Sequence, residues 1–111
     1  MGAFNTVRGQ AICPKCDKPV EVVGQFKYGN VRQVEYQLGD VLQWGGNQTG
    51  SPGISHVVVD AVAETTCPIC GYSDEWDLYV HIRRDQLIGL ETATGEHDFA
   101  KAGNTFIVLK P

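Results

Sequence analysis

The chain of 111 residues is 42% hydrophobic and 20% charged, which is ordinary for a folded protein and predicts one domain spanning residues 1–111. This composition excludes a disordered or fibrous chain. Residues 1–56 carry five basic and four acidic side chains, whereas residues 57–111 carry four basic and nine acidic ones, so the net charge of −4 arises in the second part. A negative protein repels phosphate backbones, which disfavours nucleic acid and favours a basic protein surface as the partner.

The apolar residues alternate with polar ones along most of the chain, a period typical of half-buried β-strands. After an N-terminal strand, we expect strands at residues 20–28 with a bulge at 23–24, and at 31–38, 41–44, 54–63, 77–83, 86–92 and 105–109. Turns are expected at 28–30, 39–40, 84–85 and 94–95, and no segment shows a convincing helical stripe. About eight short strands predict an all-β fold, a small antiparallel sandwich or barrel.

Residues 45–53, with the sequence GGNQTGSPG, are rich in glycine and predict a mobile surface loop between two strands. The segment is not a phosphate-binding loop, because no Gly-Lys-Ser/Thr follows and no helix is expected to start there. No apolar run is long enough to span a bilayer, and residues 1–8 lack the apolar segment of an export signal. We therefore expect a cytoplasmic protein without a membrane partner.

The four cysteines form two matching pairs, Cys13 with Cys16 and Cys67 with Cys70, separated by fifty residues. Two such turns can supply four thiolates at the corners of a tetrahedron, which predicts one structural zinc ion. Two disulfides are the alternative, and they are disfavoured because the chain has no export signal. Thioredoxin-like chemistry would need a βαβ pattern, which is absent. Four thiolates also leave no open position for catalysis by the metal.

The cysteine turns resemble those of the zinc-ribbon and rubredoxin-like group of folds. The resemblance covers about a quarter of the chain and rests on Cys13, Pro14, Cys16, Cys67, Pro68, Cys70, Gly71 and Tyr72. It departs from that pattern in the long insert between the pairs and in Asp17, which stands where glycine is usual. The group has many unrelated functions, so the resemblance implies a bound metal and a ribbon of two knuckles without implying a particular activity.

A second candidate site follows the second cysteine pair, where three acidic side chains surround a tryptophan. As a partner-binding patch, these residues would combine an aromatic anchor with charges that attract a basic protein; they are Asp74, Glu75, Trp76 and Asp77. The alternative interpretation places Trp76 over the zinc knuckle. The histidines, at positions 56, 81 and 97, are scattered, and no nucleophile–base signature is present, so we expect no enzyme.

These features together predict a non-catalytic, zinc-binding protein-interaction module. A specific version of this hypothesis is an acidic immunity-type protein that neutralises a basic bacterial toxin. One alternative is a rubredoxin-like electron carrier that holds iron in the same four sulfurs. The other is a nucleic-acid-binding zinc ribbon, which would use the basic side chains and aromatic rings of Arg8, Lys15, Lys18, Lys27, Arg32, Phe26, Tyr28 and Tyr36.

Overall fold

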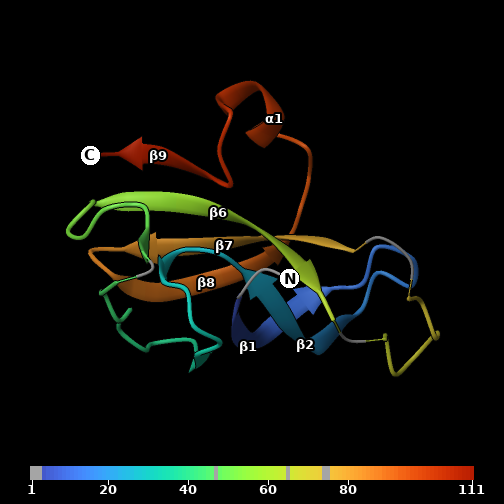
Figure 1. Cartoon of the computed structure of the whole chain (residues 1–111). Coiled ribbons are helices and arrows are strands. Elements are labelled where there is room, and N and C mark those ends of the chain that lie inside the picture. The colour runs from blue at the N-terminus through green and yellow to red at the C-terminus, as the bar shows by residue number, and fades with distance from the viewer. Residues whose placement is uncertain (1–3, 47, 65, 74–75) are drawn as a thin grey trace.

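The computed structural model describes residues 4–46, 48–64, 66–73 and 76–111, which form a curved sheet, a small two-stranded sheet and one short helix (Figure 1). The elements are β1 (Asn5–Ile12), β2 (Pro19–Phe26), β3 (Gly29–Asn30), β4 (Glu35–Gln37), β5 (Gln48–Thr49), β6 (His56–Ala63), β7 (Asp77–Arg83), β8 (Gln86–Thr92), α1 (Phe99–Ala102) and β9 (Phe106–Lys110). The all-β prediction is confirmed. No helix of the described residues is long and apolar enough to cross a membrane.

The large sheet has the strand order β4-β1-β2-β6-β7-β8, antiparallel except between β1 and β4. β6 lies at its centre and shares one of its edges between two partners. Residues 61–63 of this strand pair with β2, residues 56–59 pair with β9, and its other edge pairs with β7. The central strand is therefore covered along both edges.

The sheet curls until its outer strands are connected by residues 39–42. Gly39 donates its N–H to the carbonyl of Leu87 at 2.7 Å, and Leu87 donates in turn to Asp40 at 2.9 Å. Residues 35–42 form one segment. Its first part, β4, pairs with β1, and its last part contacts β8 through the bridge between Val41 and Gln86. The contact is too short to close the sheet, so the large sheet is open and curled and the expected barrel is not formed.

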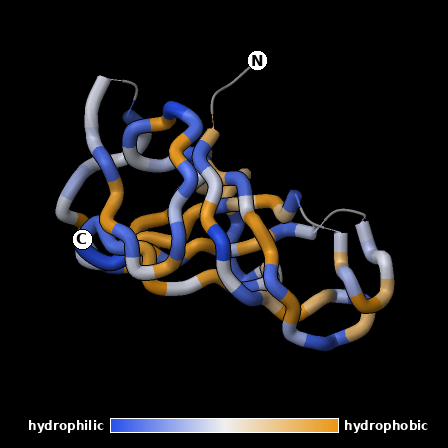
Figure 2. The backbone as a smooth tube through the Cα atoms, turned by 90° about the horizontal axis from the view of Figure 1, so that it is seen from below, coloured by the Kyte–Doolittle hydropathy of each residue, from blue (hydrophilic) through white to orange (hydrophobic). Residues whose placement is uncertain are grey.

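The core lies on the inner side of this curl, because successive side chains of a strand point to opposite faces of the sheet. Hydrophobic and hydrophilic residues alternate along the strands in Figure 2. Each fully buried aliphatic side chain contributes about 1.5–3 kcal/mol through removal from water. The one fully buried polar residue among those described is Asn5, whose amide donates to the carbonyls of Tyr28 and Asn30 at 3.1 and 3.2 Å. Its oxygen accepts from the N–H of Val34 at 3.0 Å, so Asn5 fixes the path of residues 28–34.

The outer side of the sheet carries a second, smaller apolar cluster around Val58 and Tyr79, which are also buried. The ring of Tyr79 contacts those of His97 and Phe99, with centroids 4.9 and 5.9 Å apart, and its hydroxyl accepts from the N–H of Gly95 at 3.0 Å. The chain that follows β8, including α1, thus folds back over β6 and β7, as Figure 1 shows.

Several local expectations about strands and turns are wrong. Asn30 belongs to β3, which pairs with β5, so residues 28–30 do not form a hairpin turn. The strand expected at 31–38 is reduced to residues 35–37, after Gln33 with its left-handed φ of 65°. Residues 41–44 form only one bridge, at Val41. β2 pairs with β1 without the bulge expected at 23–24; register shifts lie instead beside His56 and His81.

The helix α1 was not expected from the sequence. The helix has four residues, too few to show a helical apolar stripe in the sequence. The residues that cap its two ends stabilise it. Asp98 is the N-cap and accepts from the N–H of Lys101 at 2.9 Å, while Gly103 ends the helix with a φ of 75°.

The described residues of the glycine-rich segment lie mostly at the surface, as expected: residues 45–46, 48 and 51–53 are exposed, whereas Gly50 contacts the core. Its β5 strand pairs with β3, and the Tyr28 hydroxyl donates to the carbonyl of Ser51 at 3.3 Å. Gly50 has a φ of 85°, and a Cβ atom at this position would lie 2.1 Å from Cε1 of Tyr28. The buried Tyr28 ring therefore requires glycine here.

Replacing Gly50 with alanine is expected to lower the free energy of unfolding by at least about 3 kcal/mol, because both the left-handed backbone and the displaced ring oppose the new methyl group. Gly53→Ala is a matched control, since Gly53 also has a positive φ but a Cβ atom at this position would meet no atom within 4 Å. That variant should lose only about 1 kcal/mol. Urea denaturation measures both, and equal losses would contradict the packing of Gly50 on Tyr28.

Candidate metal centre

Two knuckles with the same backbone hydrogen bonds carry the four cysteines. In each, the carbonyl of the first cysteine accepts from the N–H four residues later, and its own N–H donates to the carbonyl five residues later. The partners are Asp17 and Lys18 for Cys13, and Gly71 and Tyr72 for Cys67, at 2.9–3.0 Å. The fourth residue after each first cysteine has a positive φ, 60° at Asp17 and 77° at Gly71.

The knuckles bring the four sulfur atoms together, and all lie within 4.8 Å of one another. The Sγ atoms of Cys13 and Cys70 are 3.6 Å apart, and those of Cys16 and Cys67 are 3.8 Å apart. A metal with bonds of about 2.3 Å to four thiolates has tetrahedral edges of roughly 3.8 Å, so the sulfurs fit such an ion. Bonded sulfurs would be about 2.05 Å apart, and all four cysteines are free. The expected clustering of the four cysteines is confirmed, in a geometry that could bind a metal ion.

Backbone N–H groups prepare the first cysteine of each knuckle to be a thiolate. The N–H groups of Cys70 and Ile69 outweigh burial and lower the pKa of Cys67 to about 6. Burial also acts to raise the pKa of Cys13, but the N–H groups of Cys16 and Lys15 leave it below its ordinary value. Burial raises the pKa of Cys16 to about 12, because its N–H donor from Lys18 is insufficient. Thiolates are the form that binds metal.

Trp76 belongs to the same buried core as Cys13 and Cys67 and is only 1% exposed. Its indole N–H donates to the hydroxyl of Thr92 at 3.0 Å, and Thr92 donates to the carbonyl of Ile12, just before the first knuckle. Its ring also meets the edge of Tyr72, with centroids 6.3 Å apart. A side chain this buried cannot anchor a partner at the surface. The geometry therefore fits the alternative interpretation, in which Trp76 covers the knuckles.

The rest of the expected acidic patch is described only in part. Asp74 and Glu75 lie outside the described residues, whereas Asp77 is exposed at the start of β7. Asp60 on β6 is also exposed, and its pKa is raised by partial burial and by the charge of Asp77. The two carboxylates therefore belong to one negative surface, which Lys27 also borders.

The aromatic rings that a nucleic-acid-binding ribbon would use for stacking are buried: Phe26, Tyr28 and Tyr36 are at most 4% exposed. The Arg8 guanidinium forms an ion pair with Glu21 at 2.6 Å. Stacking on bases needs exposed rings, so this geometry argues against that alternative.

The structure joins two histidines that looked scattered in the sequence. Nε2 of His56 lies 3.1 Å from Nδ1 of His81, and Nε2 of His81 lies 2.5 Å from a carboxylate oxygen of Glu91. His97 approaches Glu96 at 3.8 Å. Strand pairing places residues 56 and 81 near each other only through the register of β6 on β7, and no sequence pattern gives that register.

No protein-family model, curated protein or solved structure matches this chain. A fold of this kind would in any case leave the activity open, because folds host many functions. Its function must therefore be inferred from the chemistry of its own residues.

Exchanging the residues at the equivalent left-handed positions should move stability in opposite directions. Asp17→Gly is expected to raise the free energy of unfolding by about 0.5 kcal/mol, and Gly71→Asp to lower it by a similar amount. Only backbone conformation is involved at Gly71, because a Cβ atom at this position would meet no atom within 4 Å. Denaturation of the two metal-loaded variants measures the effect, and a destabilised Asp17→Gly would contradict it.

Proposed function

We propose that the protein is a non-catalytic binding module held together by one zinc ion, and that it binds a partner with a basic surface. The observation that carries the metal assignment is the cluster of four sulfurs within 4.8 Å, on two knuckles with matching hydrogen bonds. Zinc bound by Cys13, Cys16, Cys67 and Cys70 would have four protein ligands and no open position, which suits a structural role.

The metal can be tested on protein purified from a metal-replete culture. Native mass spectrometry should show one zinc ion per chain, and acid should release it. Substitution by cobalt should give the absorption of a thiolate-bound tetrahedral ion. A red protein with a reversible one-electron couple would support the rubredoxin-like alternative instead. Free thiols without metal would contradict both.

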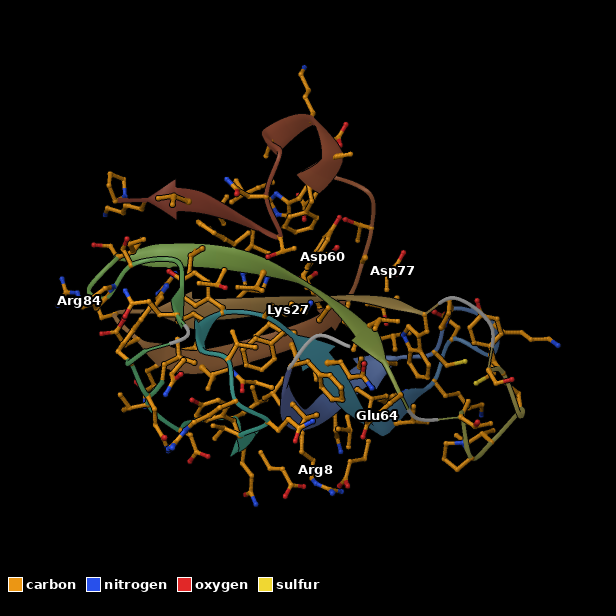
Figure 3. The ribbon with its side chains drawn as sticks, in the orientation of Figure 1. Arg8, Lys27, Asp60, Glu64, Asp77 and Arg84 are labelled. Atoms are coloured by element: carbon orange, nitrogen blue, oxygen red, sulfur yellow. The ribbon has the colours of Figure 1, made fainter. Side chains whose placement is uncertain are left out.

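Exposed carboxylates on β6 and β7 support the choice of a basic partner. Figure 3 shows Asp60 and Asp77 in the same region of the sheet, with Glu64 at the end of β6. Acidic groups arranged in this way speed encounter with a positive surface, and salt weakens the effect. An immunity-type protein that neutralises a basic toxin is one specific case of such a module.

The partner class can be tested with a lysine-rich peptide as a defined probe. Binding measured by fluorescence anisotropy should weaken with salt and with Asp60→Asn or Asp77→Asn. Glu35→Gln, on β4 at the edge of the sheet, removes a charge of the same sign and should have little effect. Equal losses for all three variants would indicate attraction by net charge alone and would contradict a localised surface.

A further inference from the structure

A small basic pocket lies where β6 begins and where β7 and β9 end. It has a volume of about 360 Å³ and is lined by Ser55, His56, Arg83, Arg84 and Lys110. Figure 3 shows Arg84 at the end of the molecule opposite to the sulfur atoms. The pocket is therefore separate from the metal centre and from the negative surface around Asp77.

The cationic side chains of this pocket are not neutralised by the protein. No acidic residue is among the described residues that line it. Arg83, Arg84 and Lys110 form no ion pair with any carboxylate in the described parts of the chain. Three like charges around one cavity repel one another, and an anion in the cavity would offset that repulsion. This concentration of positive charge occurs in a protein whose net charge is −4.

The turn that presents Arg84 is held in a conformation that arginine disfavours. Arg84 and Asp85 have φ values of 48° and 69°, as in the tight hairpin turns that usually contain Asn-Gly. Hydrogen bonds from outside the hairpin fix it: Arg84 N–H donates to Ile54 at 2.9 Å, and Leu42 N–H donates to the Asp85 carbonyl at 2.7 Å. The Asp85 carboxylate also accepts from the N–H of Gly53 at 3.0 Å. A strained position held this firmly is typical of functional sites.

The His56 side chain is also fixed in place. Nε2 of His56 is hydrogen-bonded to Nδ1 of His81, and Nε2 of His81 is hydrogen-bonded to the Glu91 carboxylate, so the three side chains hold one another in place. Nδ1 of His56 takes no part in the contact with His81, and the ring can gain a proton. An anion in the pocket would favour that protonation.

We propose that this pocket binds the phosphate group of a small phosphorylated molecule. Arginine guanidinium groups match phosphate oxygens with pairs of N–H donors, and Lys110 and the Ser55 hydroxyl supply further donors. The volume is near the lower limit of small-ligand pockets, which favours a compact ligand over an extended nucleic-acid strand. This proposal does not depend on the metal or on the basic partner proposed above.

Titration of the metal-loaded protein with inorganic phosphate, followed by amide NMR, tests the pocket directly. Saturable shifts are expected at residues 55–56, 83–84 and 110, and a sugar phosphate should produce them at lower concentration than phosphate alone. Arg84→Asn should weaken phosphate binding roughly tenfold while keeping the turn, since asparagine tolerates a positive φ. Lys27→Gln removes an equal charge outside the pocket and should leave binding unchanged.

Three results would overturn the proposal. One is the absence of saturable shifts with both phosphate and the sugar phosphate. Another is an equal loss of binding in Arg84→Asn and Lys27→Gln, which would indicate unspecific screening. The third is binding of a single-stranded oligonucleotide without binding of either small probe, which would assign the pocket to a nucleic-acid backbone.

The protonation of His56 gives an independent measurement. Burial lowers its pKa, and the nearby His81 and Arg83 on β7 and His97 before α1 lower it further. Lys110 on β9 adds positive charge on the pocket side. Phosphate in the pocket should raise this pKa, as measured by NMR titration of the imidazole ring. An unchanged pKa of His56 at saturating phosphate would contradict binding beside it.

Discussion

Replacing Cys67 with serine is expected to lower the free energy of unfolding by several kcal/mol. A structural zinc site contributes on the order of 10 kcal/mol in small zinc-finger peptides, and less is expected here because the sheet has its own core. The site joins segments that are about fifty residues apart, such as Cys16 and Cys67, so losing it removes a constraint on a long stretch of chain. Thermal denaturation with and without a strong chelator measures the loss.

The chelator also supplies the control. It should destabilise the parent protein to the level of Cys67→Ser and should have little further effect on the variant. Ile69→Ala changes an exposed side chain of the same knuckle, so its effect should stay within about 0.5 kcal/mol. A melting temperature that is unaffected by chelation would show that the cluster does not stabilise the fold.

Trp76→Ala is expected to cost about 3–5 kcal/mol of stability, the range for removing a large aromatic side chain from a core. The cavity would open between the knuckles and β8, where the indole now donates to Thr92. Trp76→Phe keeps most of the ring volume and loses that hydrogen bond, so its cost should be about 1–2 kcal/mol. Chemical denaturation of the metal-loaded variants measures both.

The same variants separate the two interpretations of Trp76. If it covers the knuckles, Trp76→Ala unfolds at lower denaturant concentration, and any loss of peptide binding follows the loss of structure. A variant that keeps its stability but no longer binds the lysine-rich peptide would restore the interpretation of Trp76 as a surface anchor.

The second part of the fold could be predicted well from the sequence, because local signals agree there. The strands expected at 54–63, 77–83, 86–92 and 105–109 correspond to β6, β7, β8 and β9 with shifts of at most two residues at an end. Their apolar residues alternate, and Arg84-Asp85 forms the expected turn between β7 and β8. The cysteine spacing likewise predicted the cluster of four sulfurs. Each knuckle connects strands of the same sheet, so the two knuckles can lie next to each other.

Residues 28–49 were predicted less well, because distant contacts decide their structure. Asn5 holds residues 28–34 through hydrogen bonds that span more than twenty positions of sequence, and no alternation of apolar residues reveals them. The burial of Trp76 also depends on a distant contact, its hydrogen bond to Thr92. The acidic residues beside it in the sequence had indicated a position at the surface. The small basic pocket lies where β6 begins and where β7 and β9 end. Its residues come together only through the register of β9 on β6, which the sequence does not reveal.

The divided edge of β6 has a consequence for chains that are incomplete. β9 covers the half of that edge that contains Val57, Val58 and Val59. Until β9 has been synthesised, or after a protease has cut it away, this valine segment presents unpaired N–H and carbonyl groups. Uncharged β-branched segments with an open edge recruit other chains into extended sheets and promote aggregation. β9 is therefore expected to protect this edge from self-association, and truncation before residue 106 should convert a stable protein into an aggregating one.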